Sequence, residues 1–157
     1  MVARSMIALI AALAAAALAM GCGGGGSSTL SKAEFTKQGN AACSKEREGT
    51  VEEVTSYLEQ HSSEGTSPPV LYASMVKAVL LPAIESELEA LEALDAPEAQ
   101  AKSVAKFTEM ERAEIEEVKG LDHVASIEAV EAHFIPSAKL ARANGISNCA
   151  NGPEPVS

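Results

Sequence analysis

The stretch L-S-K-A-E-F-T-K-Q-G-N-A-A-C, Leu30 to Cys43, begins the first helix that the sequence predicts. Ser31 and Glu34 form the pattern of a capping box, in which a serine side chain and a glutamate side chain each bind the other's backbone N–H at a helix start. Side chains that share one helical face follow this start: Phe35, Gly39, Ala42, Cys43, Thr50, Val54, Tyr57 and Leu58. We therefore expect a helix over 32–62 that is continuous through Gly49.

Turn residues separate this helix from three further helical segments. The stretch 62–69 is rich in Ser, Gly and Pro and ends the first helix. Asp95 and Ser126 are the expected N-caps of the third and fourth helices. Pro82 and Pro136 fall inside predicted helices, where the missing backbone donor predicts a kink or a break. The expected helices cover 69–94, 97–119 and 126–143.

The four segments together predict the architecture. Each carries an apolar stripe at helical spacing, and none shows the alternation of a β-strand. Four helices joined by short links favour an all-α, up-down-up-down four-helix bundle. We expect this domain to cover 31–150, and the Pro- and Gly-containing residues 151–157 to form a disordered tail.

The N-terminal segment has the pattern of a secretory signal peptide. Residues 6–20 are apolar and follow Arg4, and small residues precede an expected cleavage point. The apolar run is shorter than the roughly 20 residues that a membrane span needs. A buried core helix or an uncleaved anchor helix is the alternative, although the glycines at 23–26 would end such a helix. We expect residues 1–21 to be removed.

The residues before Cys22 resemble a bacterial lipobox, with small side chains at Ala19 and Gly21, although the lipobox usually has Leu at the place of Ala19. This resemblance implies cleavage before Cys22 and a thioether-linked diacylglycerol on its sulfur. Two acyl chains anchor a protein stably, and residues 22–30 would form the Gly/Ser tether. The alternative is ordinary cleavage that leaves a free thiol. The expected location is extracytoplasmic, at the cell membrane.

Cysteine counting predicts a disulfide. The chain has three cysteines, and lipidation of Cys22 leaves Cys43 and Cys149. An even remainder in an exported protein favours a disulfide, with two free thiols as the alternative. The four-helix model places both cysteines at one level of the bundle. A bond that closes a loop of about 100 residues stabilises a fold by roughly 4.7 kcal/mol in the chain-entropy model.

Both ends of the domain resemble small exported helical lipoproteins that are common in actinobacteria. The similar segments are L-S-K-A-E-F-T-K-Q-G-N-A-A-C at 30–43 and A-N-G-I-S-N-C at 143–149. Asn40 stands where many of these proteins have Asp, and Gly39 where Ala is usual. The resemblance implies an exported, disulfide-bonded helical bundle. It implies no activity.

The charge of the chain excludes several classes of partner. The formal net charge is −10, and loss of Arg4 with the signal peptide makes it −11. Such an acidic protein repels nucleic acids and anionic lipid surfaces. The chain contains no Trp, and its few aromatic residues form no stacking surface. Membrane association is therefore expected to come from the lipid on Cys22.

Four polar residues on predicted core faces are the candidate ligand-binding residues: Glu46, Glu87, Glu111 and His133. A buried acid must be paired or protonated, so buried acids are candidates for a functional site. The helical rise places Glu46 and Glu87 at one level, and Glu111 and His133 about 10–15 Å away along the bundle. This separation argues against one shared site, and the simpler interpretation is solvated flank residues or a structural Glu111–His133 hydrogen bond.

No metal, cofactor or catalytic motif accompanies these residues. The chain has no Glu-x-x-His pair, no HExxH or CxxCH motif and no nucleophile elbow. We expect no catalytic residues, no metal and no cofactor. The expected function is non-enzymatic binding of a partner protein or an envelope component. A helical bundle that binds a small ligand or a metal is the alternative, and an enzyme is the third possibility.

Overall fold

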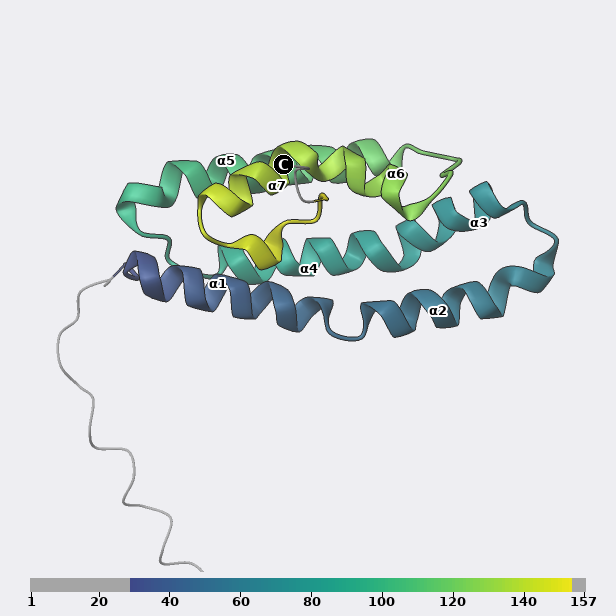
Figure 1. Cartoon of the computed structure of the whole chain (residues 1–157), viewed down its shortest axis with the longest axis horizontal. Helices are drawn as coiled ribbons and strands as arrows, with labels where there is room; N and C mark the ends of the chain where they lie inside the picture. Colours follow the sequence, from purple (N-terminus) through teal and green to yellow (C-terminus); the bar gives the residue numbers. More distant parts are fainter. Residues whose placement is uncertain (1–28, 154–157) are drawn as a thin grey trace, which may run out of the picture.

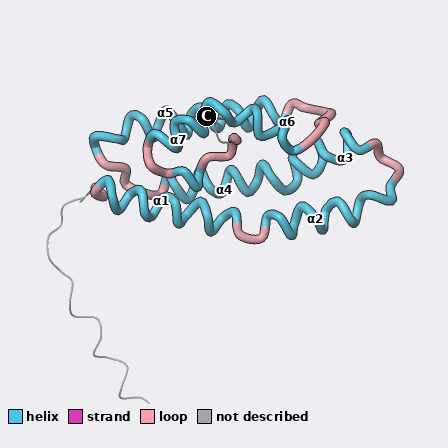
Figure 2. Tube along the Cα trace, in the orientation of Figure 1, coloured by secondary structure: helices cyan, strands magenta, loops and turns pink. Residues whose placement is uncertain are grey.

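The computed structural model describes residues 29–153, and this part of the chain is all-helical (Figure 1). The expected signal peptide, Cys22 and nearly all of the tether fall in 1–28, outside the described residues. Residues 154–157, the end of the expected tail, also lie outside them. Figure 2 shows the helices joined by short loops, with no strand in the described range.

The first predicted helix is two helices, so the expectation of continuity through Gly49 is wrong. Helix α1 covers Lys32–Arg47 and helix α2 covers Thr50–His61. Gly49 has a φ of 88°, in the left-handed region that a glycine adopts without strain, and this ends the α-helical path. The capping box at Ser31 is confirmed, with both reciprocal bonds to Glu34 present.

The second predicted helix is confirmed, with a local change of hydrogen bonding. Helix α3 covers Pro68–Met75, a π-helical turn (η2) covers Val76–Leu80, and helix α4 covers Leu81–Glu92. A 3₁₀ turn, η1 at Ser62–Glu64, precedes them. Pro82 has no N–H to donate to the preceding turn, and the π turn lies directly before it. The predicted effect of Pro82 therefore takes the form of a widened turn.

The C-terminal half contains one long helix and a segmented one. Helix α5 covers Glu98–Lys119, and its N-cap position is taken by Pro97, so the predicted Asp95 cap is wrong. The Ser126 cap is confirmed, because its hydroxyl accepts from the backbone N–H of Ala129. Pro136 lies at the start of the last helix, after a 3₁₀ turn. The elements are α6 (Ile127–Glu131), η3 (Ala132–Phe134), α7 (Ile135–Ala143) and η4 (Ser147–Cys149).

The helices pack around a single core. Helix α1 packs against α4, α5 packs against α7, and η4 lies on α1. In Figure 1 α1 and α2 follow one another along one side of the molecule, while α5 and α7 lie on the other. The largest fully buried apolar side chains are Phe35, Phe107, Phe134, Met75, Leu81, Leu88, Leu91, Ile115, Ile146, Val76 and Val118.

Residues Ala150–Pro153 form a segment that we call the C-terminal strap. Gly152 is buried, and a Cβ atom there would lie 2.7 Å from the carbonyl oxygen of Phe134. Arg142 donates to the Gly152 carbonyl at 2.8 Å. Asn151 and Gly152, which the sequence places in a disordered tail, are therefore part of the domain in the structure.

Candidate functional site

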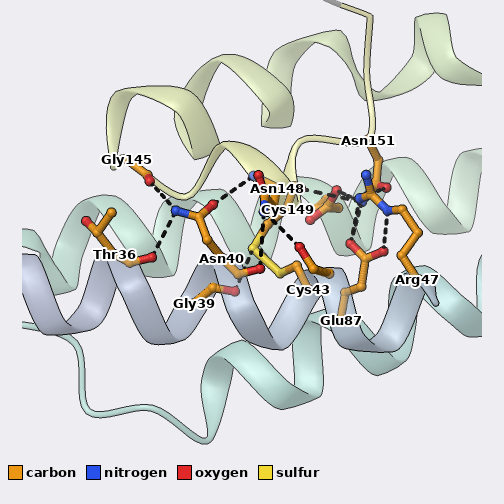
Figure 3. The surroundings of a disulfide bond; sticks show 12 residues. Thr36, Gly39, Asn40, Cys43, Arg47, Glu87, Gly145, Asn148, Cys149 and Asn151 are labelled. Atoms are coloured by element: carbon orange, nitrogen blue, oxygen red, sulfur yellow. Dashed lines mark hydrogen bonds and ion pairs between the residues drawn. A yellow bond between two sulfur atoms is a disulfide. The ribbon is translucent and has the colours of Figure 1, made fainter.

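The predicted disulfide between Cys43 and Cys149 is present (Figure 3). Cys43 lies on α1 and Cys149 at the end of η4, and their Cα atoms are 5.2 Å apart. Both residues are buried in the core. The bond therefore holds the start of the C-terminal strap against the first helix.

Asn40 reinforces this attachment beside the disulfide. Its amide nitrogen donates to the carbonyl of Gly145 at 2.8 Å, and its amide oxygen accepts from the backbone N–H of Asn148 at 2.8 Å (Figure 3). The same nitrogen also donates to Thr36 at 2.9 Å. An aspartate at this position would have no N–H for the two carbonyls.

A polar cluster lies next to the disulfide, made of the buried acids Glu87 and Glu111, the half-buried Asn151 and the exposed Arg47. Arg47 holds Glu87 through two bonds of 2.9 Å, from Nε and Nη2 (Figure 3). Arg47 Nη2 also donates to the amide oxygen of Asn151 at 2.7 Å. The amide nitrogen of Asn151 donates to Glu111 at 3.0 Å and to Glu87 at 3.3 Å. One asparagine of the strap thus joins α1, α4 and α5.

Burial controls the charges of the two carboxyl groups. Glu87 and Glu111 are 2% and 1% exposed. Burial raises the pKa of Glu111 to about 8, against the bond from Asn151, so this group is neutral at pH 7. Burial also raises the pKa of Glu87, while the Arg47 ion pair opposes the shift. The cluster therefore holds one ion pair and one neutral acid.

The structure regroups the four candidate ligand residues. Glu87 and Glu111 share Asn151, so their predicted separation along the bundle is wrong. Of the two simpler interpretations, the Glu111–His133 hydrogen bond is wrong, because Glu111 bonds to Asn151 while His133 lies 3.9 Å from Glu117 and is partly exposed. Glu46 is partly exposed and acts on Glu87 only as a nearby negative charge.

The predicted separation of Glu87 and Glu111 was wrong for a geometric reason. The rise per residue locates Cα atoms, whereas side chains lean toward the N-terminus of their own helix. On neighbouring helices of opposite direction, two glutamates at different heights lean toward each other. Asn151 then spans the remaining gap, and nothing in the composition of residues 151–157 indicated that role.

Glu114 is a third buried acid, which was not among the residues predicted from the sequence. Its Oε1 accepts from the backbone N–H of Ser137 at 3.2 Å, while its Oε2 is buried without a partner among the described residues. Burial raises its pKa, against the bond from Ser137. Its place on the same face of α5 as Glu111, three residues apart, was the available signal.

An open groove lies beside the polar cluster, with a volume of about 320 Å³. We call it the α4–α6 groove. Its apolar walls include Leu80 and Ile84 of the second helical segment, and Val130 and Phe134 of the last. The rest of its lining includes Arg47, Glu87, Glu131, Thr50, Val51 and the strap residues Ala150, Asn151, Gly152 and Pro153. Three residues of the polar cluster, Arg47, Glu87 and Asn151, therefore line a largely apolar opening.

Residues 29–153 contain no cluster suited to a metal ion and one helical stretch apolar enough to cross a membrane. No group of three or more His, Cys, Asp or Glu side chains in 29–153 is placed to hold a metal ion. The helical stretch Pro68–Glu92 has the length and the mean hydropathy, 1.2, that a membrane-crossing helix needs. Core helices meet the same criterion, and this stretch supplies Leu81, Leu88 and Leu91 to the core.

Comparison with known proteins gives no indication of the function of the chain. No protein-family model matches the chain, and neither the curated proteins nor the solved structures contain a match. The function of the chain is therefore inferred from its residues, their contacts and the groove.

Proposed function

We propose that the chain is a lipid-anchored, extracytoplasmic, non-enzymatic binding module. The lipobox-like residues before Cys22 support the anchor. The Cys43–Cys149 disulfide supports an oxidising compartment, because such bonds are rare in the cytosol. The domain that the tether carries is proposed to be an up-down-up-down bundle, which the α1–α4 and α5–α7 packing supports.

The observation that carries the binding role is the α4–α6 groove. Ligand sites are concave, mostly apolar and lined by a few convergent polar groups. The groove has this composition, and its polar residues Arg47, Glu87 and Asn151 are already fixed by bonds to one another. Fixed polar groups orient a ligand, whereas general acid–base chemistry needs a group free to exchange a proton with the substrate. This arrangement favours binding over catalysis.

The volume of the groove favours a small molecule over a partner protein as the occupant. About 320 Å³ lies at the lower end of the range for small-molecule sites. A metal is the less favoured ligand, because Glu111 contacts Asn151 while His133 lies by Glu117. An envelope component with a small apolar group is the occupant that fits this proposal.

Fractionation of cells that express the full chain tests the anchor. The wild-type chain is expected in the membrane fraction, and Cys22→Ser is expected in the soluble extracytoplasmic fraction. Ser27→Ala, a change in the same tether, is the matched control and is expected to stay with the membrane. Retention of Cys22→Ser at the membrane would contradict the proposed anchor.

A further inference from the structure

The α4–α6 groove has features that define the chemistry of its ligand. We propose that it binds a neutral medium-chain acyl group, with the acyl carbonyl beside Arg47 and the hydrocarbon against Leu80, Ile84, Val130 and Phe134. This inference deepens the binding role proposed above and rests on it. It assigns a ligand class to one place on the domain.

The apolar walls and the volume of the groove favour a hydrocarbon chain of limited length. Ile84, Val130 and Phe134 are 8%, 3% and 1% exposed, so the groove is floored by side chains of the core itself. Its volume of about 320 Å³ holds about ten non-hydrogen atoms, if each takes the roughly 30 Å³ of a water molecule in the liquid. An octanoyl group is of this size, whereas a helix of a partner protein, about 10 Å wide, is too large.

The polar residues of the lining favour a ligand that carries a hydrogen-bond acceptor. In the described part of the chain, the bonds of Arg47 to Glu87 and Asn151 use Nε and Nη2. Nη1 is left for a ligand, and the Arg47 side chain is 41% exposed. A carbonyl oxygen accepts from such a guanidinium N–H.

The charges around the groove favour a neutral ligand over an anion. The positive charge of Arg47 is compensated by Glu87, at N–O distances of 2.9 Å. Glu131 adds a negative charge to the lining, and the chain as a whole carries −10. This negative field repels a carboxylate, and the groove lining has no unpaired cation to offset the repulsion. The neutral carbonyl of an ester or amide therefore suits the site better.

Val51 supports a ligand at the rim of the groove. It is the exposed large hydrophobic residue of the described range, at 81% exposure, and it lines the opening beside Arg47. An acyl group that enters the groove covers part of this side chain. The contact gives Val51 a packing partner that the folded domain itself does not supply.

Titration of the full chain carrying Cys22→Ser tests the proposal without detergent, which would compete for the groove. The probes are methyl octanoate and octanoate, followed by amide NMR shifts and calorimetry. Saturable one-to-one binding of methyl octanoate is expected, at least tenfold tighter than octanoate, with shifts centred on Ile84 and Val130. Absence of saturable binding, or octanoate binding as tightly as the ester, would overturn the proposal.

Two variants locate the binding. Ala83→Phe places a ring in the groove and is expected to weaken methyl octanoate binding at least tenfold, whereas Ala78→Phe, exposed and outside this groove, is expected to leave it unchanged. Val51→Asp alters a side chain outside the core and is expected to weaken binding severalfold. This variant tests the proposal even if Ala83→Phe does not fold. Unchanged affinity in Val51→Asp and in folded Ala83→Phe would overturn the assignment. Neither result affects the Cys22-dependent retention that tests the anchor.

Discussion

At the scale of single residues, Glu111 links the fold to pH. Its pKa of about 8 in the folded chain lies above the 4.5 expected of an unfolded glutamate. The folded state therefore holds a proton that the unfolded state has lost, and stability falls as pH rises from about 4.5 to about 8. The groups around it are Glu87, Glu114 and Arg47.

Glu111→Gln keeps the shape and the acceptor oxygen while it removes the titration. We expect the free energy of unfolding of this variant to vary less between pH 5 and pH 8 than that of the wild type, by up to about 1 kcal/mol per pH unit. Urea denaturation at several pH values measures the difference. Parallel curves for the two proteins would show that Glu111 is not protonated in the fold.

Asn40 is the second residue with a definite prediction. Asn40→Asp removes the donors to Gly145 and Thr36, so we expect a loss of about 1–3 kcal/mol in the free energy of unfolding. Gln38→Glu makes the same change of charge on an exposed part of α1 and is the matched control. Equal stability of Asn40→Asp and Gln38→Glu would contradict the role of the amide.

At the scale of elements, Gly49 divides the first helical segment into α1 and α2. A Cβ atom at Gly49 has no other atom within 4 Å, so any cost of a substitution comes from its backbone angle, φ 88°. We expect Gly49→Ala to destabilise the domain by about 1 kcal/mol, and Gly49→Asn by less, because Asn tolerates the left-handed region. Thermal unfolding of both variants measures this, and equal stability of Gly49→Ala and wild type would contradict the break.

The elements also show what the sequence could predict. Local signals worked where a backbone group and its partner are close in sequence, as at the Ser31–Glu34 capping box and the Ser126 cap. The sequence did not determine whether the first helix continues through Gly49, because a glycine can lie inside a helix or end it. Pro82 indicated a disturbance but not its form, a π turn.

The candidate site was less predictable than the helices. The mid-stripe position of Glu111 on its helix correctly indicated burial. The partner of Glu111 was not foreseeable, because Asn151 lies 40 residues away in a Pro- and Gly-containing segment. The groove depends on the packing of α4, α6 and the strap, which helical periodicity does not determine.

At the scale of the whole molecule, the disulfide closes the domain. It joins positions 106 residues apart, and its loss in Cys43→Ala/Cys149→Ala frees a long loop in the unfolded chain. We expect the free energy of unfolding to fall by about 4.7 kcal/mol, the value of the chain-entropy model for a loop of this length. Urea denaturation measures the loss, and reduction of the wild-type disulfide is expected to reproduce it. An unchanged midpoint after both treatments would contradict this contribution.

We propose that the lipid anchor carries a disulfide-bonded binding domain. Intact mass spectrometry of the chain extracted from membranes tests both features at once. The predicted result is a chain that begins at Cys22, carries the mass of a diacylglycerol on that residue, and is two hydrogens lighter through the Cys43–Cys149 bond. A chain that keeps residues 1–21, or that has an unmodified Cys22, would contradict the account.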